Sequence, residues 1–245
     1  MSPHPTPRRP DVTGVEVVGG PERLVVGLAE HDDRWARAYR EHRRRILAAL
    51  APAPVSVEHI GSTAVPGLAA KPIVDIAVAV EDVTAEEDYL EPLLAAGYVL
   101  RVREPGHRLV RTPSRDTHVH VYGRGDPALA EYLLLRDHLR TDAADRSLYE
   151  STKRDLLRRS WDDVNACSDA KTEVIDAVKA RARAARAQHQ PAAPRTGARD
   201  RASGTQSRTA SASISTSISS RGRPVTTVVR AGRTPEEQRG TRNSP

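Results

Sequence analysis

Two short apolar runs on either side of a loop constrain the fold of this chain more than any other feature. Val55, Val57 and Ile60 form the first run, and residues 73–80 form the second, in which nearly every side chain is apolar. This pattern predicts two strands, the second of them buried on both faces. Asp75 interrupts the second strand. Because an isolated buried carboxylate is costly, Asp75 is expected to be paired, hydrogen-bonded or bound to a metal ion.

The loop between these runs has the composition of an anion-binding turn. Gly61 allows close approach of the backbone, Ser62 supplies a hydroxyl, and Pro66-Gly67 forces a turn. The spacing is not that of a GxxxxGK[ST] phosphate loop, because Leu68 stands where lysine is needed. A Gly-Ser strand end followed by a strand with an acid is the arrangement in which nucleotidyltransferases hold phosphates and Mg²⁺. Capping of the turn's own amides is the alternative role of Ser62.

A pair of histidines on the predicted strand 117–122 is the next polar feature. His118 and His120 are two residues apart, so their side chains leave the same face of the strand. With Asp75 on a neighbouring strand, they would complete a divalent metal site or supply acid and base groups. The alternative is a pair of polar residues on a solvated sheet face.

Hydrophobic periodicity and turn residues predict the remaining elements. Asp32 or Asp33 is expected to cap a helix that runs to Ala51, and Thr84 to cap a second helix that stops at Gly97. The other expected strands are 15–18, 23–28, 98–102 and 107–111, the last paired antiparallel with 117–122, and the other expected helices are 127–140, 143–160 and 164–187. These elements predict an α+β fold, a mixed sheet with helices on one side and a C-terminal helical segment.

The central stretch EHIGSTAVPGLAAKPIVDI closely resembles the signature of the GrpB-like family. That family is similar in fold to the nucleotidyltransferase superfamily and is also found fused behind dephospho-coenzyme A kinase. Later pieces fall in the family's order, namely HVHVYG at 118–123, LRDHLR at 135–140, the Tyr149 and Lys153 pair, and DAK at 169–171. The resemblance therefore covers roughly residues 14–183.

The resemblance implies roles for particular residues. Gly61 and Ser62 would contact phosphates, while Asp75 and His120 would hold Mg²⁺ or Mn²⁺ and act as the catalytic residues. His118 would lie nearer the substrate, since same-face positions on a strand are about 6.6–7 Å apart. Other positions expected to bind the nucleotide or phosphorylated small molecule, or to line its cleft, are Lys71, Arg108, Arg136, Asp137, Tyr149, Lys153 and Lys171.

Two departures from the expected pattern leave two functions open. Ala77 stands where a two-metal nucleotidyltransferase has its second acid, and Cys167 stands where the family usually has tyrosine. One hypothesis is an enzyme of the nucleotidyltransferase type that transfers a nucleotidyl group. The other is a non-catalytic nucleotide- or coenzyme-binding module related to coenzyme A metabolism. Ala77 favours the second, whereas Asp75 and the histidine pair favour the first.

Composition divides the chain into three parts. Residues 1–13 are proline-rich and are expected to be a disordered lead-in, and residues 14–188 are expected to form the folded domain. Residues 189–245 contain few large apolar side chains, so this basic tail cannot bury enough surface to offset its ordering entropy.

Charge and cysteine content narrow the partners and the compartment. The net charge of +6 resides in the tail, because residues 190–245 contain ten arginines and three acids. The folded part is therefore expected to bind no specific nucleic acid, and few aromatic residues are present for base stacking. Cys167 is the single cysteine, which excludes an internal disulfide, and no apolar run approaches a membrane span. We expect a cytoplasmic protein with no membrane partner, and the sequence leaves its oligomeric state open.

Overall fold

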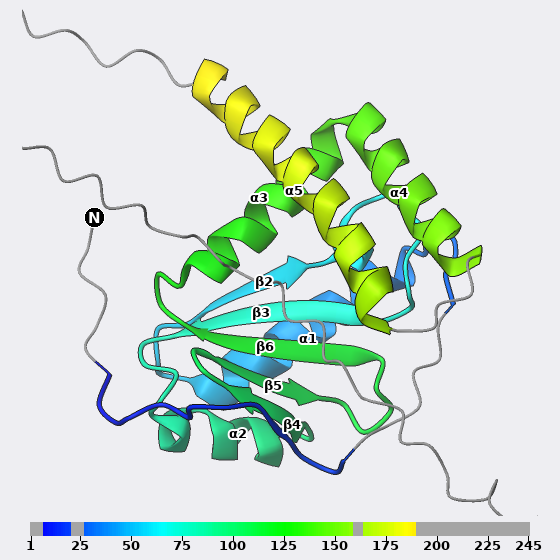
Figure 1. Ribbon diagram of the computed structural model, residues 1–245. Coiled ribbons are helices and arrows are strands. Elements are labelled where there is room, and N and C mark those ends of the chain that lie inside the picture. The colour runs from blue at the N-terminus through cyan, green and yellow to red at the C-terminus, as the bar shows by residue number, and fades with distance from the viewer. Residues whose placement is uncertain (1–6, 21–26, 159–163, 190–245) are drawn as a thin grey trace, which may run out of the picture.

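A six-stranded mixed sheet forms the centre of the protein (Figure 1). The computed structural model describes residues 7–20, 27–158 and 164–189, and the side chains of 164–171 and 189 are outside the description. The strands are β1 Glu16–Val17, β2 Ser56–Ile60, β3 Val74–Val80, β4 Val99–Glu104, β5 His107–Arg111 and β6 Thr117–Gly123. Their order across the sheet is β1-β4-β5-β6-β3-β2. Neighbours are antiparallel except for β3 and β6, which are parallel.

The first two helices cover one face of this sheet. They are α1, Arg34–Leu50, and α2, Leu90–Ala95. Alternation along β3 directs Val74, Ile76 and Val78 to this face, where they join one continuous apolar core. That core also contains Trp35, Ile46 and Leu50 of α1, Tyr89, Leu90 and Leu93 beside α2, and Val110, Val119 and Val121 of β5 and β6. The expected buried character of the second apolar run is confirmed.

Three further helices gather beyond the β2 edge (Figure 1). They are α3 Pro127–Thr141, α4 Ala143–Arg158 and α5 Val164–His189, close to the expected bounds. A second, smaller core links them to the loop after β2, through Val65, Leu68, Leu139, Tyr149 and Val178. The C-terminal helices therefore pack on the loop that the sequence singled out, as well as on one another.

Two expected elements differ in detail. Thr84 does not cap α2, because its amide and hydroxyl are both bonded to the Asp82 carboxylate, and a short 3₁₀ turn, Glu86–Asp88, precedes the helix. The expected strand 23–28 lies largely outside the described residues. The mixed sheet, the antiparallel β5–β6 pair and the C-terminal helical segment are confirmed. Over the part of the chain described, no helix has both the length and the apolar character needed to cross a membrane.

Candidate metal and phosphate site

The parallel pairing of β3 with β6 brings the acid and the two histidines together. In this register Asp75 lies beside His118, and Ala77 lies beside His120. Since Val74, Ile76 and Val119 face the core under α1, the alternate residues face the opposite side of the sheet.

The two histidine rings converge on one carboxylate oxygen. Oδ1 of Asp75 is 3.5 Å from Nδ1 of His118 and 3.5 Å from Nε2 of His120. The ring centroids are 6.3 Å apart, near the strand repeat, but the planes differ by 73°. The rings can therefore meet the same oxygen through different nitrogens. His118 and His120 therefore both lie beside Asp75, and which of them would contact an ion or a substrate stays a prediction.

Solvent can reach this cluster. The side chains are 31% exposed for Asp75, 25% for His118 and 16% for His120. Burial by itself would raise the pKa of the Asp75 carboxyl, but the neighbouring His118 and His120 rings outweigh it and hold that pKa well below its usual range. Asp75 is therefore ionised at neutral pH.

The distances between donor atoms in the cluster can be compared with those of hydrogen bonds and of metal ligands. N–H···O hydrogen bonds are commonly about 2.7–3.2 Å long, shorter than both contacts with Asp75. Ligand atoms about 2.1 Å from a shared ion lie roughly 3.0–3.4 Å apart. The three side chains each offer one donor atom, and these atoms all lie within 4.8 Å of one another. The three donor atoms are thus close enough together to share one ion.

A second group with ligand-like spacing consists of His138, Asp142 and Asp145. Here the chain already supplies the cation, because Arg181 donates hydrogen bonds of 2.5–2.9 Å to both oxygens of Asp145. His138 Nε2 is also 2.6 Å from Asp145. This group is an ion-pair network that joins α3, α4 and α5.

Gly61 fits closely against the cluster at the start of the loop. Its φ of 72° and ψ of −172° belong to a region that side-chain-bearing residues rarely adopt. A Cβ at this position would lie 2.7 Å from Oδ2 of Asp75. The absence of a side chain lets the loop backbone approach the carboxylate, as the sequence predicted for this glycine.

Helix α4 holds the rest of the loop in place. Lys153 is 8% exposed, and its Nζ donates to Ser62 Oγ at 3.2 Å and to the Ala69 carbonyl at 2.5 Å. Glu150, one helical turn earlier, accepts from the Ala69 amide at 3.0 Å. The ring of Tyr149 lies 4.8 Å from Nζ of Lys153. Ser62, Tyr149 and Lys153 are thus brought together, with a buried cation beside the loop.

Arg108 is not brought to the cluster. Its β5 position pairs with Val121, so its side chain lies on the α1 and α2 side of the sheet. There it is 2% exposed and bonded to Asp11 at 2.7 Å and to Glu86 at 2.6 Å. Strand alternation therefore places Arg108, which was expected to bind the ligand, on the face away from the Asp75 cluster. A basic residue on a strand cannot be assigned to a face from its identity alone.

The other expected positions are spread more widely. Lys71 is partly buried in the loop just before β3. Arg136 bonds to Glu58 at 2.8 Å, to the His59 carbonyl at 3.0 Å and to Asp137 at 2.8 Å, so it ties α3 to the β2 edge. The side chains of Lys171 and Cys167 are outside the described residues.

Sequence reasoning missed three polar neighbours of the cluster on the same sheet face. Arg111 is the β5 partner of His118. His107 lies 3.1 Å, through Nε2, from Nδ1 of His120, and it contacts Glu104 through Nδ1. Once the β5–β6 hairpin had been predicted, alternation from His118 and His120 would have placed His107 and Arg111 on this face.

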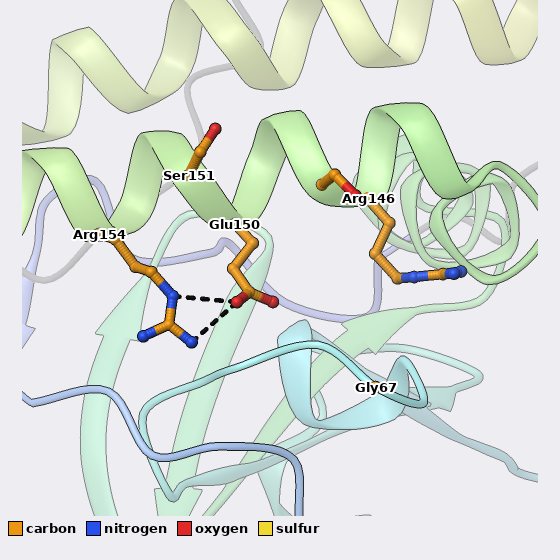
Figure 2. A pocket seen from close by; sticks show the side chains of 6 residues that line it. Gly67, Arg146, Glu150, Ser151 and Arg154 are labelled. Atoms are coloured by element: carbon orange, nitrogen blue, oxygen red, sulfur yellow. Dashed lines mark hydrogen bonds and ion pairs between the residues drawn. The ribbon is translucent and has the colours of Figure 1, made fainter.

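A pocket of about 250 Å³ lies between the loop and α4 (Figure 2). Its lining consists of Gly67, Arg146, Ser147, Glu150, Ser151 and Arg154. Arg154 lies against Glu150 in Figure 2 and also bonds to Glu30. Arg146 donates to the carbonyls of Leu139 and Arg140. Both arginines are engaged within the protein, and none of the six lining residues belongs to the Asp75 cluster.

Comparison with known proteins gives one consistent family. A family model described as GrpB protein matches residues 25–181. A UPF0157 protein of Streptomyces coelicolor is 69% identical over 179 residues, which cover 73% of this chain and 96% of that protein. The crystal structure of the conserved protein GrpB from Enterococcus faecalis aligns with a TM-score of 0.56 and 28% identity, over 64% of this chain and 96% of that one.

A longer relative also matches. A protein of Mycolicibacterium paratuberculosis named dephospho-CoA kinase is 31% identical over 173 residues, which cover 59% of this chain and 42% of that protein. The family predicted from the central stretch is confirmed, and so is its occurrence within proteins named dephospho-CoA kinase.

Proposed function

The chain belongs to the GrpB family, and we propose that it binds a divalent metal ion together with a nucleotide or phosphorylated small molecule. One observation carries the proposal, namely that Oδ1 of Asp75 lies 3.5 Å from a ring nitrogen of both His118 and His120. In the proposed site all three side chains are ligands. The metal, when bound, would neutralise phosphate charge.

The donor set favours Mn²⁺ over Mg²⁺. Mg²⁺ prefers six oxygen ligands and retains several waters, whereas Mn²⁺, as a transition-metal ion, accepts imidazole nitrogen more readily than Mg²⁺ does. Two of the three donors here are nitrogens. Of the two ions that the sequence suggested, Mn²⁺ is therefore expected to bind more tightly.

The loop after β2 supplies the phosphate side of the proposed site. Gly61 brings the loop backbone next to Asp75. The ammonium group of Lys153 donates a hydrogen bond to the hydroxyl of Ser62, so a positive charge lies beside the loop. A phosphate held there would lie between the loop and the metal ligands. Backbone amides and a buried ammonium group are suited to this anion.

The proposed reaction is nucleotidyl transfer from a nucleoside triphosphate with release of pyrophosphate. Binding without turnover is the second candidate, and Ala77 favours it. In the β3–β6 register Ala77 lies beside His120, on the same face as Asp75, so a second carboxylate is absent where a two-metal site would use it. This second candidate would be a binding module related to coenzyme A metabolism, since a relative is named dephospho-CoA kinase.

Substitution of Asp75 tests the metal site. We expect Mn²⁺ to raise the melting temperature of the wild type, and Asp75→Asn to weaken Mn²⁺ binding by about 100-fold or more in isothermal titration, because the only anionic ligand is lost. Asp155→Asn is the matched control, since it removes the same charge from an exposed ion pair with Arg158 on α4. Absence of any metal-dependent shift in the wild type, with Asp75→Asn several kcal/mol less stable, would identify Asp75 as a structural acceptor.

Turnover is measured separately from binding. The protein is incubated with each labelled nucleoside triphosphate and Mn²⁺ or Mg²⁺, and bound nucleotide and released pyrophosphate are quantified. Pyrophosphate release that Asp75→Asn abolishes would support transfer. Nucleotide binding without release would support the second candidate.

A further inference from the structure

A buried hydrogen-bonded chain lies behind His120 on the site face of the sheet. Glu104 and His107 close the hairpin between β4 and β5, where they are a cross-strand pair on either side of Pro105-Gly106. Gly106 has a φ of 75°, which lets two residues complete the turn. Glu104 is 4% exposed and His107 is 8% exposed. The turn thus directs a carboxylate and an imidazole into the interior together.

His107 joins Glu104 to the candidate metal ligand His120. Its Nδ1 contacts Oε1 of Glu104, and its Nε2 lies 3.1 Å from Nδ1 of His120. Its ring also stacks on Tyr122, with centroids 4.7 Å apart and planes 22° apart. Packing and hydrogen bonding therefore fix the orientation of the His107 ring.

Counting the protons along these hydrogen bonds gives the tautomer of His120. A carboxylate can only accept, so the proton of the Glu104 contact belongs to Nδ1 of His107. Nε2 of a neutral His107 is then an acceptor, and Nδ1 of His120 must donate to it. His107 is 8% exposed, and burial disfavours a charged imidazole ring. Nε2 of His120 is left with a lone pair directed toward Asp75.

We infer that Glu104 and His107 are positioning residues that hold His120 in the Nδ1–H tautomer and so present its Nε2 to a cation beside Asp75. The inference rests on the proposed metal site. It assigns a function to two buried polar residues that do not touch the ion themselves. Outer partners of this kind orient metal-binding imidazoles and raise their basicity.

A purely structural role would favour the opposite tautomer. With a proton on Nε2, His120 would donate to Asp75, and its Nδ1 would accept from His107. The Glu104 contact opposes this arrangement because a neutral His107 has only one proton, and that proton is on Nδ1 in the hydrogen bond to Glu104. In the inferred state two acceptors, Nε2 of His120 and Oδ1 of Asp75, face each other at 3.5 Å. A cation between them would turn this unfavourable pair into two ligand bonds.

The tautomer is measured on the full-length, metal-free protein by long-range ¹H–¹⁵N correlation of the histidine rings. We expect His120 of the wild type to be in the Nδ1–H form. His107→Ala, which removes the acceptor, should convert it to a mixture and weaken Mn²⁺ binding by about 10- to 100-fold in isothermal titration. His107→Gln, whose side-chain oxygen can accept from Nδ1 of His120, should fall between the wild type and His107→Ala.

The matched control is His42→Gln. His42 is another partly buried histidine with two hydrogen-bond partners, Tyr98 at 2.7 Å and Thr117 at 3.2 Å, and it belongs to α1 on the other face of the sheet. This substitution should leave both the His120 tautomer and the Mn²⁺ affinity unchanged.

The two readouts separate this inference from the metal proposal. A wild-type His120 in the Nε2–H form, or a His107→Ala variant with unchanged tautomer and unchanged Mn²⁺ affinity, would overturn the positioning role. A wild type that fails to bind Mn²⁺ while its His120 is in the Nδ1–H form would overturn the metal site and leave tautomer control by Glu104 and His107 supported.

Discussion

Gly61 determines how closely the loop after β2 can approach Asp75. Its backbone conformation already disfavours any side chain, and a Cβ would also lie 2.7 Å from the carboxylate. Gly67, in the same loop, has a similar φ of 75°, but a Cβ there would meet nothing within 4 Å. Substitution of the two glycines can therefore distinguish the effect of backbone strain from the effect of contact with Asp75.

We expect Gly61→Ala and Gly67→Ala each to lower the free energy of unfolding by about 1–3 kcal/mol, because both place a side chain at positive φ. Gly61→Ala alone should also weaken Mn²⁺ binding, since its methyl group must displace Asp75. Urea denaturation and isothermal titration of the two variants provide the test. Equal Mn²⁺ affinities in both variants would contradict a role for Gly61 beside the ligand.

At the residue scale, sequence patterns predicted which candidate site residues gather better than they predicted how the side chains are arranged. Asp75, His118 and His120 could be predicted as a group, because a carboxylate in an apolar strand and a same-face histidine pair are both local patterns. Which nitrogen of each ring meets Asp75 could not be predicted, since side-chain torsions depend on packing. The face on which Arg108 lies could not be predicted either, because it depends on the register of β5 with β6.

At the scale of elements, α4 acts as a support for the loop. Lys153 and Glu150 bind the carbonyl and the amide of the same residue, Ala69. Arg140 of α3 adds a bond of 2.9 Å to the Ala64 carbonyl. These contacts join segments more than seventy residues apart. Helix patterns in the sequence could therefore predict α3 and α4, but not that these helices bind the loop after β2.

Lys153→Met should release this support while keeping a side chain of similar length. The buried Ala69 carbonyl would lose its donor, at a cost of about 1–3 kcal/mol in the free energy of unfolding. Amide hydrogen exchange in residues 62–70 should accelerate, and triphosphate affinity should fall. Arg154→Met, on the same helix but in an exposed ion pair with Glu30 and a partly buried one with Glu150, should change stability by no more than about 1 kcal/mol. Unchanged exchange in the loop of Lys153→Met would show that α4 does not hold it.

At the scale of the whole molecule, the sheet separates a stability face from a candidate functional face. The apolar face packs against α1 and α2, and its Val- and Ile-rich strands were readable from the sequence. The other face carries Asp75, His107, His118 and His120. The strand order could not be predicted from periodicity, because the β3–β6 pairing that assembles the site joins strands separated by β4 and β5.

Acid should destabilise the folded protein through His59, at the edge of the sheet. Its ring stacks on Tyr39 with centroids 4.7 Å apart, and its Nε2 lies 3.2 Å from the Thr63 hydroxyl, which donates to the Ile73 carbonyl. Thr63 therefore accepts from Nε2–H of a neutral ring. Burial lowers the pKa of His59 to about 4. The unfolded chain binds this proton near pH 6.5, so it binds more protons than the folded chain between these two values, and stability falls as the pH falls through this window.

One-site linkage predicts that His59 removes about 2–3 kcal/mol from the free energy of unfolding between pH 7 and about pH 4.5. Urea denaturation of the wild type and His59→Gln at both pH values isolates this contribution, because carboxylates elsewhere affect both proteins alike. Gln can still donate to Thr63 but does not titrate, so the wild type should lose more stability than His59→Gln by that amount. Equal losses in the two proteins would mean that the His59 ring is protonated as readily in the folded state as in the unfolded chain, and that its contact with Thr63 is not made by a neutral ring.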